Sequence, residues 1–332
     1  MTRASVVITV KNEENTILPL LSSLAYQALK PYEIIIVDGG SEDRTLGIIR
    51  SFIDSNHESL MRVRVILANN ANRAQGRNIG IAATSSDIVA CTDAGVVLDK
   101  CWLQNLVRPI ASGRVDFAGG VYVQGDGSLL QKCIGILQYP NLEKLSEDDF
   151  LPSSRSVAFK KTVWESVGGY PEYLEKAEDT LFDLTVHQKF KVGLARDAVV
   201  CWPARNTFRE LFLQYSSYAD WDMKSGLFLR VKIYRLMILA YVFLAFSIFL
   251  ILTFGFIGFL PSFSITMTYL TYAGVKAFRK THITKAFFLA MAIKITIFSA
   301  ETLGIMKGAF NRVRQAKRKT SDKLKSEPIA KQ

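Results

Sequence analysis

The chain has few of the residues that build metal clusters and disulfide frameworks. Its 332 residues include only four cysteines and three histidines. The cysteines are widely spaced and form no paired metal-binding motif: Cys91, Cys101, Cys133 and Cys201. This pattern predicts neither a zinc site nor a disulfide framework, and it favours reduced thiols.

A glycine-rich turn is missing where a dinucleotide-binding fold needs one. The residues that follow the first apolar run, "KNEENT" (11–16), contain no glycine. A nicotinamide dinucleotide site uses glycines at this turn so that the backbone can approach the pyrophosphate. The sequence therefore excludes that class of cofactor site.

Charged residues are absent from one long stretch of the chain. Residues 236–260 form a run of 25 without a charge, and at about 1.5 Å per residue a helix of this length exceeds the roughly 30 Å hydrocarbon core of a bilayer. A buried helix of a soluble domain is the alternative, but such a helix rarely needs apolar residues on every side. The run predicts a transmembrane helix. The first apolar segment, "ASVVITV", is too short for a signal peptide, so we expect the first 230 or so residues to stay in the cytoplasm.

Two further apolar stretches follow, at 263–278 and 286–305. The second contains Lys294 and Glu301, which are seven positions apart and so share one face of a helix, as an interfacial or partner-facing helix requires. Basic clusters before the first run and after the second belong on the cytoplasmic side by the positive-inside rule. We therefore expect two transmembrane helices plus an interfacial or third helix between residues 236 and 305.

The C-terminal segment, 306–332, is strongly basic. It carries nine lysines and arginines against two acidic residues, within a chain of net charge +11. A basic tail that follows membrane segments favours a cytoplasmic surface of anionic lipid over nucleic acid. The predicted partners therefore include membrane lipids and exclude nucleic acid.

Short β-branched runs alternate with helix-like segments through the first hundred residues. The predicted strands are 5–10, 33–37, 63–67 and 87–92, and the predicted helices between them are 13–29, 43–54 and 73–84. This alternation is typical of a parallel, doubly wound α/β sheet. Ligands bind such sheets beyond the carboxyl ends of the strands. Asp38 and Asp93 follow the second and fourth strands, so we expect both acids at one edge.

Four segments in order carry a resemblance to a known family: "VVITVKNEENTILPLLSSL", "IIIVDGGSEDRT", "NRAQGRNIGIAATSSDIVACTDAGVVLDKCWL" and "VGGYPEYLEKAEDTLFDL". Together they resemble the family-2 glycosyltransferases, whose nucleotide-sugar domain has the Rossmann-like GT-A fold. The similarity covers about residues 4–200. The segment "QYSSYADWDMKSG" (214–226) resembles the membrane-proximal part of enzymes that act on exopolysaccharides or lipid-linked sugars.

The resemblance implies a nucleotide-sugar site at the predicted sheet edge. Thr9, Lys11 and Glu13, at the end of the first strand and in its turn, would help to hold the nucleotide. Asp38 would accept a hydrogen bond from the base, and charged acceptors form the stronger class of hydrogen bond.

A second group of family positions falls on the segment that faces the nucleotide and diphosphate in relatives. These positions are Arg73, Arg77 and Asn78 in this chain. Arginine presents a planar fork of donors that suits phosphate oxygens, although each arginine could equally pair with an acid.

The family's Asp-X-Asp metal motif reads "TDAG" (92–95) here, which is a departure from the pattern. Asp93 is present, but Gly95 stands where the second carboxylate would be. A cation bound to a diphosphate needs only one or two protein carboxylates. The resemblance therefore implies a divalent cation, Mg²⁺ or Mn²⁺, with Asp93 as its ligand.

The family's Glu-Asp motif falls on Glu178 and Asp179, at the start of a predicted helix, 178–190. Acids in a first helical turn also complement the helix dipole without any catalytic task. The resemblance implies that Asp179 is the general base of an inverting transfer and that Glu178 positions the acceptor or the base. The loop 152–161 would shape the acceptor side, where Arg155 and Lys160 meet either an acceptor phosphate or solvent.

These inferences divide the chain into four parts: a GT-A glycosyltransferase domain (1–205), a membrane-proximal helical segment (206–235), a membrane region (236–305) and a basic cytoplasmic tail (306–332). The expected enzyme is a multi-pass protein of the cell membrane with a cytoplasmic catalytic domain. It would transfer a sugar from a UDP- or GDP-linked donor to a lipid-linked or polysaccharide acceptor. A non-catalytic membrane scaffold with the same fold and a related nucleotidyl- or phosphosugar enzyme are the alternatives.

Overall fold

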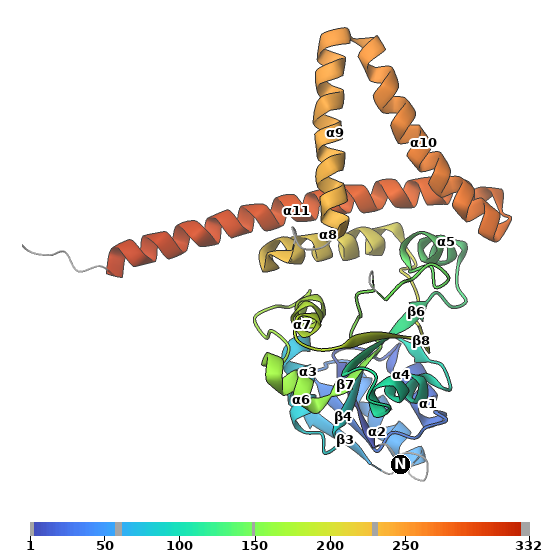
Figure 1. Ribbon diagram of the computed structural model, residues 1–332, viewed down its shortest axis with the longest axis vertical. Coiled ribbons are helices and arrows are strands. Elements are labelled where there is room, and N and C mark those ends of the chain that lie inside the picture. The colour runs from blue at the N-terminus through green and yellow to red at the C-terminus, as the bar shows by residue number, and fades with distance from the viewer. Residues whose placement is uncertain (1–2, 57–61, 148–149, 228–231, 327–332) are drawn as a thin grey trace, which may run out of the picture. The chain divides into compact units, whose positions relative to one another are not determined.

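The computed structural model describes residues 3–56, 62–147, 150–227 and 232–326. The chain divides into two compact units. The first unit contains Met1–Gly127 and Gln138–Ala204, and the second contains Ser128–Leu137 and Arg205–Gln332. The first unit is built around one sheet, whereas the helices of the second unit include the three long C-terminal ones (Figure 1).

The N-terminal part of the first unit follows the predicted alternation. Its elements are β1 (Ala4–Val10), α1 (Ile17–Ala25), β2 (Glu33–Asp38), α2 (Thr45–Ser55), β3 (Val63–Leu67), α3 (Arg73–Ala82) and β4 (Ile88–Asp93). The predicted strands and the second and third helices are confirmed to within about two residues, while the first helix is shorter than expected. Because β1, β2 and β4 are buried along nearly their whole length, they read as continuous apolar runs.

The remaining strands make the sheet mixed. They are β5 (Val97–Leu98), β6 (Phe117–Val123), β7 (Val157–Lys160) and β8 (Val192–Cys201), joined by α4 (Trp102–Ala111), α6 (Lys161–Val167) and α7 (Glu178–His187). The strand order is β3-β2-β1-β4-β7-β6-β8-β5. β7 runs antiparallel to both β4 and β6. The predicted parallel arrangement therefore holds for the first four strands and ends at β7.

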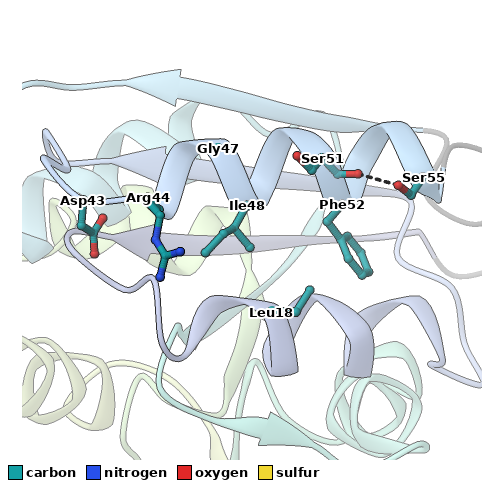
Figure 2. A pocket seen from close by; sticks show the side chains of 8 residues that line it. All are labelled: Leu18, Asp43, Arg44, Gly47, Ile48, Ser51, Phe52 and Ser55. Atoms are coloured by element: carbon teal, nitrogen blue, oxygen red, sulfur yellow. Dashed lines mark hydrogen bonds between the residues drawn. The ribbon is translucent and has the colours of Figure 1, made fainter.

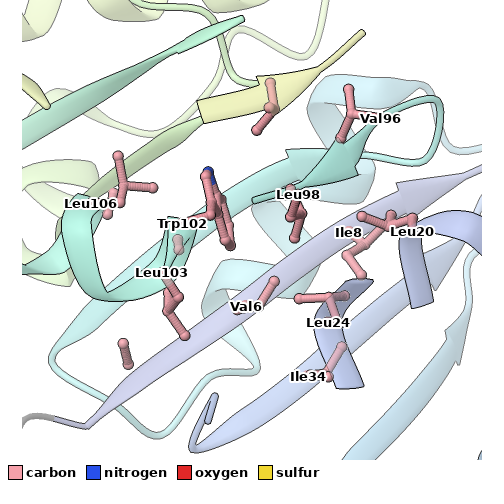
Figure 3. Packing of buried hydrophobic residues seen from close by; sticks show 14 of the residues in the cluster. Val6, Ile8, Leu20, Leu24, Ile34, Val96, Leu98, Trp102, Leu103 and Leu106 are labelled. Carbon is pink, nitrogen blue, oxygen red and sulfur yellow. The ribbon is translucent and has the colours of Figure 1, made fainter. Parts of the chain in front are cut away.

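Helices cover both faces of this sheet. On one face, Ile8 and the side chains of α1 and α4, including Leu20 and Trp102, form one buried cluster (Figure 3). On the other face, Val7 packs in a second cluster with Phe159 and with Phe182 of α7. Consecutive residues of β1 thus enter opposite cores, because successive strand side chains point to opposite faces.

The strand register places two acids at the carboxyl edge of the sheet. Val10 of β1 is paired with Asp38 of β2, and Thr9 of β1 is paired with Asp93 of β4. The prediction that both acids lie at this edge is confirmed.

The second unit consists of α5 (Leu129–Gln138), α8 (Phe208–Ser225), α9 (Lys232–Phe254), α10 (Phe256–Thr281) and α11 (Thr284–Ser326). Residues 128–137, which the sequence places in the glycosyltransferase domain, belong to this unit instead. Within it, Cys133 of α5 is buried, with its Sγ 3.9 Å from the carbonyl oxygen of Ala286 in α11.

Helices α8 and α11 pack closely because α11 has glycines where they meet. A Cβ atom added to Gly304 would lie 2.2 Å from the carbonyl oxygen of Ser216, and one added to Gly308 would lie 2.7 Å from that of Asp220. Asp220 is itself buried, and its carboxylate accepts a hydrogen bond from Lys224 at 2.8 Å. Nζ of Lys307 in α11 lies 3.7 Å from Oδ2 of Asp220, so a polar contact joins the two helices.

The apolar run 236–260 is two helices and not one, so the prediction of one continuous helix there is wrong, while the prediction that this run crosses a membrane stays a prediction. α9 ends at Phe254 and α10 begins at Phe256. Gly255 between them has a φ of +56°, a left-handed conformation that glycine adopts without a Cβ clash. The two helices form a hairpin in Figure 1.

Among the described residues, one helical stretch, Thr284–Arg312 in α11, combines the length and the apolar composition of a membrane span. Tyr241–Phe254 is a shorter apolar stretch. The predicted boundary at residue 305 falls inside α11, and residues 327–332, the end of the predicted basic tail, lie outside the described part. Arg230, which belongs to a predicted basic cluster, also lies outside it.

Alanine substitutions at two glycines, Gly80 in α3 and Gly47 in α2, test whether α3 must pack closely on the sheet. We expect Gly80→Ala to lower the free energy of unfolding by about 1–3 kcal/mol, because its Cβ would lie 2.5 Å from Cγ1 of Val7. Gly47→Ala in α2, where no atom lies within 4 Å, should be neutral or stabilise by up to about 1 kcal/mol. Urea unfolding followed by tryptophan fluorescence compares the two variants. Equal effects of both substitutions would contradict the close packing.

Candidate active site

The loops that follow β1 and β2 are fastened to each other by hydrogen bonds. The amide of Asn12 donates to Oγ of Ser41 at 2.9 Å, and the amide of Glu13 donates to Oγ1 of Thr45 at 2.7 Å. Thr9 is half-buried against α3, while the Lys11 side chain is exposed. The predicted nucleotide residues Thr9, Lys11 and Glu13 thus lie on a well-supported rim at the carboxyl edge of the sheet.

The carboxylate of Asp38 accepts hydrogen bonds from the turn that follows it. Its side chain is 1% exposed and accepts hydrogen bonds from the amides of Gly40 at 3.2 Å and Ser41 at 3.0 Å, and from the Ser41 hydroxyl. Gly40 has a φ of +90°, which the turn requires. Recognition of a base by Asp38 therefore stays a prediction, and it requires one of these local hydrogen bonds to give way.

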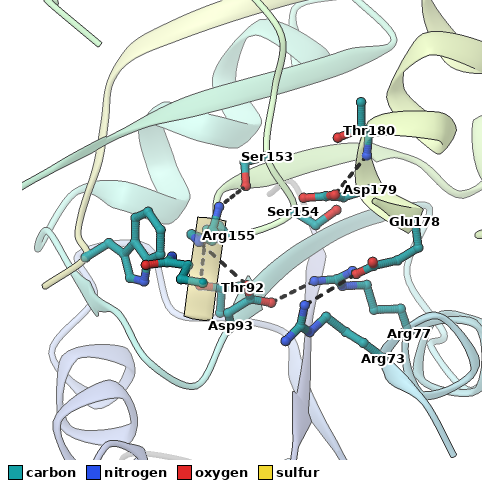
Figure 4. Close-up of polar contacts among 12 residues, drawn as sticks. Arg73, Arg77, Thr92, Asp93, Ser153, Ser154, Arg155, Glu178, Asp179 and Thr180 are labelled. Atoms are coloured by element: carbon teal, nitrogen blue, oxygen red, sulfur yellow. Dashed lines mark hydrogen bonds and ion pairs between the residues drawn. The ribbon is translucent and has the colours of Figure 1, made fainter. Parts of the chain in front are cut away.

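Arg77 is the centre of the polar network that Figure 4 draws. One terminal nitrogen donates to Oε1 of Glu178 at 2.7 Å and the other donates to Oδ1 of Asp93 at 2.8 Å. The side chain is 2% exposed, and the guanidinium lies 5.3 Å from the centre of the Tyr170 ring. The family resemblance predicts that Arg77 faces the diphosphate. The structure instead encloses it as a bridge between carboxylates from β4 and α7.

Asp93 lies among three arginines. Burial raises the pKa of its carboxyl, but the guanidinium groups of Arg77, Arg73 and Arg155 outweigh burial and lower the pKa to about 2. Nε of Arg155 lies 3.9 Å from Oδ2 of Asp93, on the side away from Arg77. Asp93 is therefore a carboxylate at neutral pH.

The sequence left the environment of Arg155 open between an acceptor phosphate and solvent. Arg155 lies in the loop before β7, where the hydroxyl of Thr92 donates to its carbonyl oxygen at 2.8 Å. Its guanidinium stacks 3.8 Å from the ring centre of Trp202. Lys160, the other cation considered for this loop, instead pairs with Asp116 at 2.7 Å. No local motif signals the stack, because Arg155 and Trp202 are far apart in the chain.

Arg73 and Asn78 have different environments although both lie on α3. The Arg73 side chain is 49% exposed, and its nearest carboxylate oxygen is Oε1 of Glu178, at 3.7 Å. Asn78 donates to the Tyr170 carbonyl oxygen at 2.9 Å and to Glu172 at 2.8 Å, and it accepts from Trp164 at 2.9 Å. Arg73 can still reach a ligand, whereas Asn78 anchors the segment that leads into α7.

The two acids at the start of α7 are unequal. Glu178 is buried against Arg77, and burial together with the charge of Asp179 raises its pKa. Asp179 is only partly buried, and its Oδ1 accepts from the amide of Thr180 at 2.8 Å. Asp183, one turn later, is fully buried, and burial and Asp179 raise its pKa well above the usual range. Of the three acids, Asp179 is the one that a second substrate can reach.

The carboxylates of this site do not fit a divalent cation. Asp93 is the single acid of the "TDAG" motif, and both of its oxygens lie beside guanidinium groups. Across the described ranges, no group of three or more His, Cys, Asp or Glu side chains could hold a metal ion. The predicted metal ligand is thus already neutralised by protein cations.

A groove between α1 and α2 lies apart from these residues. Leu18, Ile48 and Phe52 line it, with Asp43 and Arg44 at one end (Figure 2). It contains none of the predicted site residues, so we assign it no role in catalysis.

Comparison with known proteins relates part of the chain to one family. Residues 5–147 match the family described as Glycosyl transferase family 2. Glycosyltransferase AglE of Haloferax volcanii is 25% identical over 244 residues, which cover 71% of this chain and 78% of that protein. The O-antigen chain rhamnosyltransferase RfbN of Salmonella typhimurium is 24% identical over 209 residues, covering 59% of this chain and 65% of that protein, just under two thirds of its length.

A solved structure shares the fold. The mannosyltransferase PcManGT from Pyrobaculum calidifontis, in complex with GDP-Man and Mn²⁺, superimposes with a TM-score of 0.60 at 17% sequence identity, covering 93% of this chain and 88% of that one. At this identity the likeness concerns the fold alone, and it agrees with a mixed GT-A sheet. The chain is a glycosyltransferase whose residues 5–147 match glycosyl transferase family 2.

Proposed function

We propose that this glycosyltransferase moves a sugar, with inversion, from a nucleoside diphosphate to a hydroxyl group of a lipid-linked or polysaccharide acceptor. The observation that carries the proposal is the contrast at the start of α7. Glu178 is buried and bonded to Arg77, whereas the adjacent Asp179 is partly exposed. Such a pair supplies one fixed acid and one acid that an acceptor can contact.

The reaction assigns a task to each of these groups. The carboxylate of Asp179 takes the proton of the acceptor hydroxyl while that oxygen attacks the anomeric carbon. The bond from the anomeric carbon to the diphosphate breaks on the opposite face, so the configuration inverts. Negative charge then builds up on the leaving diphosphate, next to the arginines around Asp93.

The donor is a nucleotide sugar linked to UDP or GDP. The GDP-Man complex of a protein with the same fold supports this class of donor, and the rim formed by Thr9, Lys11 and Glu13 is the part of the site that holds the nucleotide. Asp38 recognises the base once its turn relaxes.

The solved structure with the same fold contains Mn²⁺, so the place of a divalent cation in this chain has to be considered. In this chain Asp93 is the residue that would hold it, and the cation would stabilise the diphosphate. The donor set around Asp93 does not fit such an ion, because its carboxylate is bonded to Arg77. Each step of the proposed transfer therefore uses the protein's own groups.

The helices of the second unit support the proposal of membrane attachment. α9 and α10 have 23 and 26 residues, which span roughly 35–39 Å at about 1.5 Å per residue and so exceed a hydrocarbon core of about 30 Å. Large apolar side chains are exposed on both: Leu239, Val242, Phe249, Leu252, Phe256 and Ile257. Lipid is the environment in which such side chains are stable.

α11 contains the one described helical stretch that is long and apolar enough to span a membrane, but it packs along α8. α8 carries Arg209, Glu210, Asp222 and Lys224, and a crossing by α11 would draw these charges into the bilayer at high cost. The favoured topology is a membrane-crossing α9–α10 hairpin, with α8 and α11 at the cytoplasmic surface beside anionic lipid.

Asp179→Asn tests the base. The amide keeps the shape of the carboxylate but cannot take up a proton, so we expect transfer to slow by about 10²- to 10⁴-fold while nucleotide affinity stays within twofold. Asp197→Asn, at an exposed acid, is the control. Release of nucleoside diphosphate with and without acceptor, together with calorimetric titration, measures both quantities. Transfer at the original rate would remove Asp179 from the mechanism, and absence of transfer in the unsubstituted protein would favour the scaffold alternative.

Arg77→Met tests the bridge. Removal of one partner of a buried ion pair leaves uncompensated charge and typically costs 3–5 kcal/mol, so we expect a loss of about this size in the free energy of unfolding. Arg108→Met is the matched control, because its side chain is 67% exposed and lies 3.7 Å from an exposed acid. Urea midpoints decide the comparison. If the two variants were equally stable, Arg77 would not be a bridge between buried acids.

Reporter fusions test the topology. A reporter inserted at Gly255, in the turn of the hairpin, should lie outside the cytoplasm, and one fused after residue 332 should lie inside. Alkaline phosphatase and green fluorescent protein report the two compartments. An external C-terminus would mean that α11 crosses the membrane.

A further inference from the structure

Asp183 of α7 is a buried acid that the proposed transfer does not use. Its side chain is 0% exposed. Within the described part of the chain, neither of its carboxylate oxygens has a hydrogen-bond partner. A buried carboxylate without a donor is costly, and proteins avoid this cost by pairing the charge or by keeping the group neutral. The groups around Asp183 decide between these two states.

The position of Asp183 in its helix explains why no backbone donor reaches it. Asp179 lies in the first turn of α7, where backbone amides are free, and it accepts a hydrogen bond from the amide of Thr180 at 2.8 Å. Asp183 lies one turn later, where the amides are already used within the helix. Asp179 therefore has a backbone donor that stabilises its charge, whereas Asp183 has none within α7.

The neighbouring side chains do not supply a donor either. Five titratable groups act on Asp183 or are acted on by it: Glu178 and Asp179 of α7, Arg77 of α3, Cys91 of β4 and Tyr170 of the loop before α7. Arg77 is the cation of this set, but its terminal nitrogens bond other acids and its Nε bonds no described group. The hydroxyl of Tyr170 is paired with Ser154 at 2.8 Å. Among the described residues, Asp183 therefore has no hydrogen-bonded counter-ion.

The closeness of Asp179 favours the neutral state of Asp183. Burial and the charge of Asp179 raise the pKa of Asp183 well above the usual range, against the effect of Arg77. Residues four apart on a helix share one face, with Cβ atoms about 5–6 Å apart. When two carboxylates share a site in this way, one of them keeps a proton more firmly. Burial disfavours the charged form, so the buried acid is the one that keeps it.

We propose that Asp183 stays protonated in the folded protein and donates a hydrogen bond to the carboxylate of Asp179, which orients Asp179 as the base. This inference rests on the proposed function, and it makes Asp183 a positioning residue. The pair holds one proton before transfer. The acceptor hydroxyl gives its proton to Asp179 as the new glycosidic bond forms, so the pair then holds two, and Asp179 returns its proton to solvent on its exposed side.

The pH dependence of transfer tests the hydrogen bond. Asp183→Asn keeps a neutral donor of the same shape, so we expect its pH–rate profile to match that of the unsubstituted protein. Asp183→Leu has no donor. The charged form of the base then loses a hydrogen bond, so the acidic limb of the profile should move to higher pH by about 0.5–1 unit, which slows transfer about three- to tenfold below that limb. Release of nucleoside diphosphate by the full-length protein in detergent measures the profiles.

Urea unfolding at different pH values tests the proton without any activity. A protonated Asp183 ionises when the protein unfolds at neutral pH, so its contribution to stability is complete below about pH 4 and is lost as the pH rises. Asp183→Asn has no such loss. Its urea midpoint should therefore gain on that of the unsubstituted protein between about pH 4 and pH 8. Asp54→Asn, at an exposed acid of α2, makes the same change of group and should show no gain.

Different failures point to different errors. If Asp183 were ionised, both of its substitutions would remove a negative charge, and the acidic limb would move to lower pH in Asp183→Asn and in Asp183→Leu. That result, or an unmoved limb in Asp183→Leu, would overturn the inference and leave the proposed function intact. A midpoint difference that is the same at every pH would also overturn it, even if Asp183→Leu did not fold. Absence of transfer by the unsubstituted protein would overturn the proposed function, and the positioning role with it.

Discussion

The bridge formed by Arg77 is the interaction on which the site depends. A guanidinium group buried to this degree is stable only with partners, and it has two, Asp93 and Glu178. Its position depends in turn on how closely α3 lies on the sheet. A Cβ atom at Gly76 would lie 2.9 Å from Cγ2 of Thr9, and one at Gly80 would lie 2.5 Å from Val7. Two glycines on one helix thus let the arginine reach the carboxyl edge.

The bridge also separates the roles of neighbouring acids. Glu178 and Asp179 are adjacent in sequence, yet one faces Arg77 in the interior and the other is partly exposed. Burial and the charge of Asp179 raise the pKa of Glu178, against the effect of Arg77. The proposed transfer uses two carboxylates with different tasks, and in this structure the difference between Glu178 and Asp179 follows from which of them Arg77 contacts.

The elements of the first unit could be predicted from sequence because each is a short apolar run between turn residues. The edge position of Asp38 and Asp93 followed from the same pattern. The side-chain partners within the site could not be predicted. Arg77 and Glu178, for example, are 101 positions apart in the chain, and no local sequence pattern links them. The antiparallel strand β7 was missed for a similar reason. It pairs with β4, but it is separated from β4 in the chain by several elements, including α5. Asn78 and Asp38 occupy positions that match the family's motifs. Their hydrogen bonds to backbone groups, however, can be recognised only from the three-dimensional structure.

The mixed order of the sheet has a consequence for synthesis on the ribosome. When residue 93 has emerged, the four parallel strands and Arg77 are present, but the bridge still lacks Glu178, and β7, which pairs with β4, has not been made. At translation rates of about 5–20 residues per second, roughly 5–20 s separate Arg77 from its second acid. During that interval the free edge of β4 is an unpaired strand in a crowded cytoplasm, open to pairing with other chains. The edge of β4 in the nascent N-terminal half therefore stays unpaired until β7 has been synthesised.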